Sequence, residues 1–153
     1  MKVDSTCPPD QGVVLALLRA VNDHDLDAFM ATLHEDIVYT LHHEGFEPAR
    51  GRLEVREAWD NLLRAFPDLG FDVSDVVVRE GHAVAHWRMS GSLAAPWPLG
   101  SKMAIPVGPM RSLSLRGVDI FAIKDGFISR KDSYVDVGVW FQAFANITTS
   151  LPR

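Results

Sequence analysis

The sequence predicts a single α+β domain in which about three helices pack on a curved, mixed and mostly antiparallel sheet, giving a cone. Two observations predict this class. Over most of the first 66 residues, apolar side chains recur at intervals of three and four, the period of helices that bury one face. From about residue 71 onward they alternate with polar side chains, the period of strands. Helices followed by a meandering sheet form the α+β pattern.

The three helices each carry one apolar stripe. The first is expected over residues 10–22, the second follows Asp25 as a plausible N-cap, and the third follows Gly51 and ends before Pro67. The stripes are Val14, Leu17, Leu18 and Val21, then Leu26, Phe29, Met30 and Leu33, then Val55, Trp59, Leu62, Leu63 and Phe66. The first two helices should pack as a hairpin.

The strands are separated by turn signals at Glu80-Gly81 and Lys124-Asp125-Gly126. Residues 94–109 contain four prolines and are expected to form a long loop. Residues 137–144 are apolar enough to dock back as a short helix or extension. The expected strands cover residues 36–44, 71–79, 82–91, 111–123 and 127–136.

A chain of 153 residues with 47% hydrophobic and 23% charged side chains is typical of one globular domain with its own core. We expect a flexible N-terminus over residues 1–9, a single α+β barrel domain over residues 10–146 and a C-terminal tail over residues 147–153.

The composition argues against several function classes. A net charge of −5 with scattered basic residues lacks the basic stripe that nucleic acid requires. No apolar run approaches the roughly 20 residues that cross a bilayer, and the first ten residues lack the apolar centre of a secretory signal. The single cysteine, Cys7, supports neither a disulfide framework nor a cysteine metal site. We therefore expect a cytoplasmic protein without nucleic-acid or membrane partners.

Asp119 is the strongest catalytic candidate, because the alternation from Leu113 to Ile123 places its carboxyl on an otherwise apolar strand face. Low dielectric penalises the ionised form, so an unpaired carboxyl there should hold a proton near neutral pH and act as a general acid or oxyanion stabiliser. Alternatively, Asp119 accepts hydrogen bonds from an Arg, a His or a backbone amide and serves only the fold.

Tyr39 is the second candidate, since it lies between apolar strand residues and its hydroxyl would reach the same cavity. The alternative is an aromatic core residue with its hydroxyl at the edge. His42, His43 and Glu44 resemble a metal cluster, but adjacent strand residues face opposite sides, so no metal site is expected. His43 shares the face of Tyr39, either as a base at the mouth of the pocket or as a structural histidine.

No phosphate-binding loop, nucleophile elbow or dinucleotide fingerprint occurs in the sequence, so no cofactor is expected. The order of elements, together with the short motifs at residues 22–29, 34–36, 65–68, 116–121 and 124–128, resembles the SnoaL-like polyketide cyclases over about residues 11–144. These proteins belong to the nuclear transport factor 2 superfamily, with ketosteroid isomerases and limonene-epoxide hydrolases. The resemblance implies their cone-shaped fold, but the superfamily also includes domains that only bind, so function depends on the site.

The resemblance implies roles for particular positions. Asp119 falls where the isomerases place the aspartate of their oxyanion hole and where the cyclases place a pocket histidine. Tyr39 falls on the tyrosine that helps the epoxide hydrolases hold water. Ser133 replaces an acid of both the cyclases and the epoxide hydrolases. The neighbouring Asp132 faces away from the pocket by plain alternation, unless a strand bulge turns it inward instead. Leu17 and Leu41 replace the oxyanion tyrosine and the base of the isomerases, while Trp87 and Met89 replace an Arg and an Asp of the epoxide hydrolases.

What remains is an apolar cavity suited to a hydrophobic, polyketide- or terpenoid-like ligand. Its predicted substrate-binding residues are Leu17, Leu41, His43, Trp59, Trp87, Met89, Phe121 and Ser133. The first hypothesis is a cofactor-independent cyclase or isomerase of secondary metabolism that uses Asp119 and Tyr39. The second is a noncatalytic binding or accessory domain, and an epoxide hydrolase is a distant third. The mixed outer face of the sheet is compatible with a homodimer.

Overall fold

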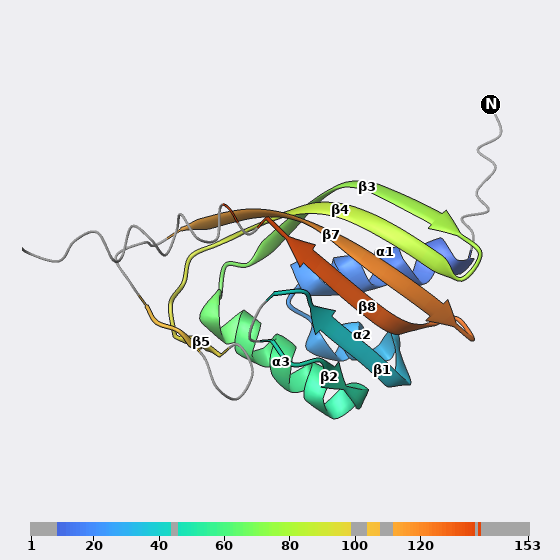
Figure 1. Cartoon of the computed structure of the whole chain (residues 1–153), viewed down its shortest axis with the longest axis horizontal. Coiled ribbons are helices and arrows are strands. Elements are labelled where there is room, and N and C mark those ends of the chain that lie inside the picture. Colours follow the sequence, from blue (N-terminus) through green and yellow to red (C-terminus); the bar gives the residue numbers. More distant parts are fainter. Residues whose placement is uncertain (1–8, 44–45, 99–103, 108–111, 137, 139–153) are drawn as a thin grey trace, which may run out of the picture.

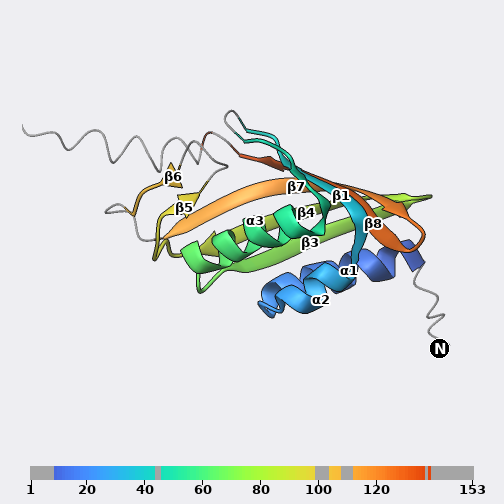
Figure 2. The same ribbon diagram turned by 90° about the horizontal axis from the view of Figure 1, so that it is seen from below.

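The computed structural model describes residues 9–43, 46–98, 104–107, 112–136 and 138. It places three helices against one face of a curved sheet, and none of these described helices covers the other face (Figure 1, Figure 2). The predicted α+β class is confirmed.

The helices are α1 (Pro9–Asn22), α2 (Leu26–Ala31) and α3 (Gly51–Ala65). Asp25 is the predicted N-cap of α2, and its side chain accepts a hydrogen bond from the Ala28 amide at 2.9 Å. The second helix is shorter than expected, since Leu33 already belongs to the first strand. α1 and α2 pack against each other as a hairpin (Figure 2). No helix in the described ranges is both long and apolar enough to span a bilayer.

The main sheet contains six strands, β1 (Leu33–Leu41), β2 (Ala49–Arg50), β3 (Gly70–Arg79), β4 (His82–Gly91), β7 (Leu113–Lys124) and β8 (Phe127–Val135). Their order in the sheet is β2-β1-β8-β7-β4-β3. Strand β1 runs parallel to β8, and every other neighbouring pair is antiparallel. The expected barrel is wrong, because β2 and β3 remain as separate edges and the sheet is curved but open.

Both predicted hairpin turns are present and use left-handed backbone conformations. Glu80 and Gly81 have φ angles of 30° and 74°, and Asp125 and Gly126 have φ angles of 53° and 78°. Glycine adopts this region without steric cost. These turns set the antiparallel pairing of β3 with β4 and of β7 with β8.

The segment expected to be a long loop contains two short paired strands, β5 (Trp97–Pro98) and β6 (Ala104–Ile105). Trp97 is buried and packs edge-on against Phe66 of the α3 C-cap, with ring centroids 5.4 Å apart. This contact holds the proline-rich segment against the end of α3. Cys7 and the C-terminal tail lie outside the described residues. The structure describes only Pro9 of the expected N-terminal segment and only Gly138 of residues 137–144.

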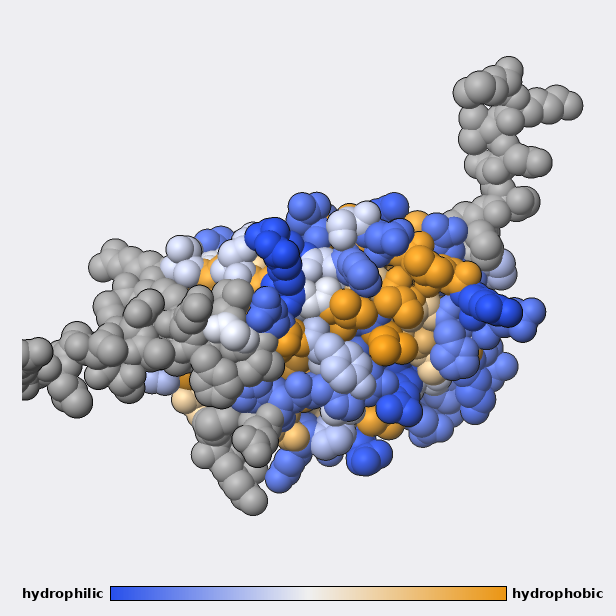
Figure 3. Space-filling model, turned by 45° about the horizontal axis from the view of Figure 1, so that its top comes forward, coloured by the Kyte–Doolittle hydropathy of each residue, from blue (hydrophilic) through white to orange (hydrophobic). Residues whose placement is uncertain are grey.

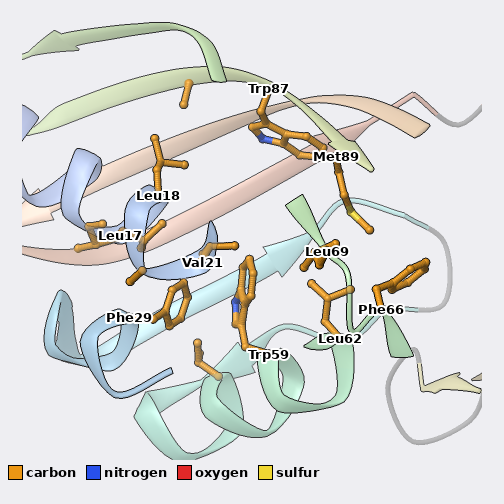
Figure 4. Close-up of a cluster of buried hydrophobic side chains, with 14 of the residues drawn as sticks. Leu17, Leu18, Val21, Phe29, Trp59, Leu62, Phe66, Leu69, Trp87 and Met89 are labelled. Carbon is orange, nitrogen blue, oxygen red and sulfur yellow. The ribbon is translucent and has the colours of Figure 1, made fainter. Parts of the chain in front are cut away.

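The hydrophobic core lies between the helices and the inner face of the sheet. Figure 4 shows Leu17 of α1, Phe29 of α2 and Trp59 of α3 pointing into the space below Trp87 and Met89 of β4. All five side chains are buried. Because burying one large apolar side chain contributes about 1.5–3 kcal/mol, these contacts hold the helices against the sheet.

Candidate functional site

Strand register brings the polar residues of the inner face together. On one row across the sheet, Lys131 of β8 pairs with Tyr39 of β1 on one side and with Phe121 of β7 on the other. On the next row, Ser133 of β8 pairs with Asp119 of β7. Residues two apart on a strand share a face, so Lys131 and Ser133 point to the same side.

Asp119 is buried, with 2% of its surface exposed, and it is fully paired. Its Oδ2 atom lies 2.8 Å from the Lys131 Nζ, and its Oδ1 atom accepts a hydrogen bond from the Ser133 hydroxyl at 2.6 Å. Lys131 also donates to the Ser133 Oγ at 2.7 Å. The Asp119 carboxyl is therefore paired within the protein, so the unpaired carboxyl of the sequence-based hypothesis is not what the structure contains.

Lys131 was missed by the sequence reasoning, although a signal for it existed. Its side chain is almost completely buried and occupies the centre of the site. Once Ser133 is placed on the inner face, strand alternation places Lys131 there as well. The ammonium lies over three aromatic rings, with Nζ 5.1 Å from the ring centre of Tyr39, 5.5 Å from that of Trp59 and 5.7 Å from that of Phe121. Cation–π attraction therefore adds to the ion pair.

Tyr39 connects this buried cluster to a cavity. Burial and the neighbouring Asp119 carboxylate raise the pKa of the Tyr39 phenol well above its usual value, and a hydrogen bond with Ser133 acts in the opposite direction. The net effect keeps the phenol neutral at physiological pH. A neutral phenol retains its proton and remains a hydrogen-bond donor.

The cavity has a volume of about 660 Å³, within the range of small-molecule sites. It lies between α3, β1, β2 and β5, and it includes three of the predicted site residues, namely Tyr39, Leu41 and Trp59. The other described lining residues are Phe46, Glu47, Pro48, Ala49, Glu54, Glu57, Ala58, Asn61, Leu62, Trp97 and Pro98.

The remaining predicted ligand contacts lie elsewhere. Leu17, Trp87, Met89 and Phe121 are buried in the hydrophobic core and are absent from the described lining of this cavity. His43 also lies outside the described lining, and its ring meets that of Phe46 edge-on at 6.1 Å.

Two tryptophans carry buried indole N–H groups that have no hydrogen-bond partner among the described residues, Trp59 and Trp87. Such a donor is costly to leave unpaired. The Trp87 ring also packs against the backbone of β7. A Cβ added at Gly117 would lie 2.3 Å from this ring. Only glycine at this position leaves room for the Trp87 ring.

Asp132 lies on the outer face of the sheet, as plain alternation from Ser133 predicts. It is 2.8 Å from His42 Nε2 and 2.5 Å from Arg130 Nε. Burial alone would raise the pKa of Asp132, but the hydrogen bonds from His42 and Arg130 and their charges outweigh it and lower the pKa. His42 stacks on Tyr134 with ring centroids 4.3 Å apart.

No group of three His, Cys, Asp or Glu side chains suited to a metal ion is found among the residues that the structure describes. Glu44, one of the three residues weighed as a metal cluster, is outside them. His42 and His43 follow β1, and His42 is engaged with Asp132 on the outer face.

Comparison with known proteins identifies the family. The sequence matches the SnoaL-like domain over residues 14–131, which is most of the chain, and the protein therefore belongs to the SnoaL-like family. No curated protein matches the sequence significantly.

Solved structures confirm the fold over nearly the whole chain. A protein described as a SnoaL-like polyketide cyclase from Jannaschia Sp. CCS1 has a TM-score of 0.76 at 19% identity, covering 99% of both chains. TsrD from Streptomyces laurentii has a TM-score of 0.71 at 27% identity, covering 93% of this chain and 97% of its own. An LEH-like epoxide hydrolase from M. tuberculosis has a TM-score of 0.65 at 18% identity, covering 93% of both chains.

Proposed function

We propose that this protein is a cofactor-independent cyclase or isomerase that acts on a hydrophobic, polyketide- or terpenoid-like small molecule in secondary metabolism. One observation carries the proposal. The buried Lys131–Asp119 ion pair lies against Tyr39, with the Lys131 Nζ 5.1 Å from the centre of the Tyr39 ring, and the Tyr39 side chain lines a cavity of about 660 Å³. A charged network of this kind is costly to bury, and here it is connected to a space that fits a ligand.

In the proposed mechanism, Tyr39 donates its phenolic hydrogen bond to a substrate carbonyl oxygen. Enolisation passes an α-proton of the substrate to a base, for which the cavity lining offers the carboxylates of Glu54 and Glu57. The enolate, or the alkoxide of an aldol-type ring closure, carries negative charge on the former carbonyl oxygen, and a preorganised donor stabilises that charge. Lys131 lies over the Tyr39 ring at 5.1 Å and stabilises negative charge that shifts toward the phenol oxygen. The apolar walls at Leu41 and Trp59 hold the substrate in one reactive conformer.

Asp119 has a positioning role in this mechanism. It accepts hydrogen bonds from Lys131 and Ser133, so it fixes both groups relative to Tyr39. Because Asp119 is absent from the described lining of the cavity, its effect on the substrate passes through Lys131, whose ammonium lies over the Tyr39 ring. This role replaces the general acid suggested by the sequence.

The test is to incubate the pure protein with a panel of linear β-polyketones and cyclic enones and to follow products by mass spectrometry. Isomerisation leaves the mass unchanged, and aldol ring closure followed by dehydration releases one water. We expect Tyr39→Phe to reduce turnover by about 10²–10³-fold, the effect of removing one oxyanion donor. Asp132→Asn on the outer face is the matched control and should retain turnover. Equal turnover by Tyr39→Phe and the unmodified protein would refute the mechanism.

A second candidate is a noncatalytic small-molecule-binding or accessory domain. It is favoured by the complete pairing of Asp119 within the protein, which is also what a structural carboxylate requires. This function predicts that panel compounds bind without being consumed and that Tyr39→Phe changes only affinity. A diol formed from an epoxide would instead support the less favoured epoxide hydrolase.

We further propose that the outer face of the sheet forms a homodimer interface. Figure 3 shows apolar side chains gathered on one face of the molecule. Exposed apolar residues of the outer face include Val77 of β3 and Ile120 of β7, which flank Val84 on the same row of the sheet. Contiguous exposed apolar surface of this kind is typical of protein interfaces.

A further inference from the structure

The mouth of the cavity carries negative charge. Glu47, Glu54 and Glu57 all line it and are all exposed. None of the described lining residues is a Lys, an Arg or a His. A cleft lined by charge of one sign concentrates ligands of the opposite sign.

The inner wall of the same cavity is aromatic. Tyr39, Phe46, Trp59 and Trp97 contribute rings to the lining, and the faces of such rings attract cations. The protein already seats one ammonium against two of them, because the Lys131 Nζ lies 5.1 Å from the ring centre of Tyr39 and 5.5 Å from that of Trp59. These rings therefore combine an apolar contact surface with affinity for positive charge.

We propose that the cavity selects hydrophobic ligands that carry a protonated amine. The apolar body of the ligand lies against the aromatic wall, and its ammonium group lies among the carboxylates at the mouth. This inference rests on the proposed function for the cavity itself and adds the charge of the ligand. Neutral ligands gain only the apolar contacts, whereas anionic ligands are repelled by three carboxylates.

Two of the three glutamates are suited to testing. Glu54 accepts a hydrogen bond from the Arg50 amide at 2.8 Å, so replacing it would also disturb the start of α3. Glu47 and Glu57 are exposed, and replacing both with Gln removes two charges with little change in shape. Glu35→Gln, at an exposed position of β1 outside the described lining, is the matched control.

The experiment measures binding of three probes of similar size by calorimetry and by NMR titration of the indole N–H signals. The probes are tryptamine, which is cationic, tryptophol, which is neutral, and indole acetate, which is anionic. We expect tryptamine to bind at least about fivefold more tightly than tryptophol, with indole acetate weakest. In the double variant Glu47→Gln/Glu57→Gln, the ratio of the tryptamine affinity to the tryptophol affinity should fall toward one. The control Glu35→Gln should keep the ratio of the unmodified protein. Added salt should also reduce this affinity ratio in the unmodified protein.

The outcomes separate this inference from the proposed function. Equal binding of tryptamine and tryptophol overturns the charge preference and leaves the hydrophobic cavity in place. A preference that survives in Glu47→Gln/Glu57→Gln overturns the assignment to these carboxylates. Failure of all three probes to shift the Trp59 indole signal, identified with Trp59→Phe, overturns both the inference and the proposed use of the cavity.

Discussion

The two faces of β8 carry charged clusters of similar composition in different environments. On the inner face, Lys131 pairs with Asp119 and both side chains are at most 5% exposed. On the outer face, Asp132 pairs with His42 and Arg130, whose side chains are 35% and 62% exposed. Lys131 of the inner cluster and Asp132 of the outer cluster are neighbours in the sequence.

The comparison shows that burial, more than residue type, decides what a charged pair does. In the outer cluster only the Asp132 side chain is buried, with 8% exposed, while water and salt reach its partners His42 and Arg130, so replacing Arg130 should cost little energy. The inner cluster has lost its hydration, so each charge depends on the other. An arrangement that is this costly to bury and that contacts a cavity wall through Tyr39 is a better functional candidate than the outer one.

The largest expected effect comes from breaking the inner pair. Lys131→Met leaves the Asp119 carboxylate buried without its cation, and we expect the free energy of unfolding to fall by about 3–5 kcal/mol. Arg130→Met, one residue away on the outer face, should cost no more than about 1 kcal/mol. Urea denaturation of both variants measures the difference. Similar losses in the two variants would contradict the distinction drawn between the faces.

A double replacement keeps this prediction testable if Lys131→Met does not fold. Asp119→Leu/Lys131→Met substitutes apolar side chains for both charges, a change that is often neutral or stabilising in other buried pairs. We expect it to recover most of the stability while lacking the turnover proposed above.

A substitution on the outer face of the sheet should change the association state of the protein instead of its stability. Ile120 is 40% exposed at the middle of the sheet, and Ile120→Lys would place a charge within the proposed dimer interface. We expect light scattering to show a dimer for the unmodified protein and a monomer for this variant, with little change in the unfolding midpoint of the isolated monomer. Leu53→Lys, at an exposed position of α3, is the control. A monomeric unmodified protein would rule out the interface.

The smallest expected effect concerns acid stability. The pKa of Asp132 is lowered in the folded protein, so its contribution to stability is present above the usual carboxyl pKa, about 3.9, and is lost as the pH falls through the lower folded value. Asp132→Asn should lose about 1–2 kcal/mol near neutral pH and flatten the stability profile below about pH 4. Asp75→Asn, at an exposed position of β3, is the control. Thermal unfolding from pH 3 to pH 7 tests this.

Much of the fold was predictable because its signals are local. The Asp25 cap, the turns at 80–81 and 125–126 and the helical apolar stripes all depend on neighbouring residues, and the structure contains them. Leu33 was assigned to a helix because its spacing from Phe29 is helical, yet it pairs with Ile128 as the first residue of β1. Tertiary pairing outweighed local periodicity there.

The site was less predictable because it depends on register across strands. Asp119 and Ser133 were both identified from the sequence, but their pairing with each other was not. The pairing of β7 with β8 shifts at Ser129, since Ala122 pairs with Arg130 and Ile123 with Ile128. Such a bulge reverses which residues of a strand face inward. Alternation from the buried Ile128 would therefore place Lys131 on the wrong face.

Sequence alone determined the α+β class, the resemblance to a family now confirmed, and the presence of a carboxyl on an apolar strand face, because each depends on periodicity or on short motifs. Only the tertiary structure decided which groups contact that carboxyl. A one-residue bulge in the β7–β8 hairpin brings the Lys131 ammonium and the Ser133 hydroxyl to it, and the pairing of β8 with the sequence-distant β1 places the Tyr39 phenol beside Lys131. Long-range register of this kind leaves no periodic signal in the sequence.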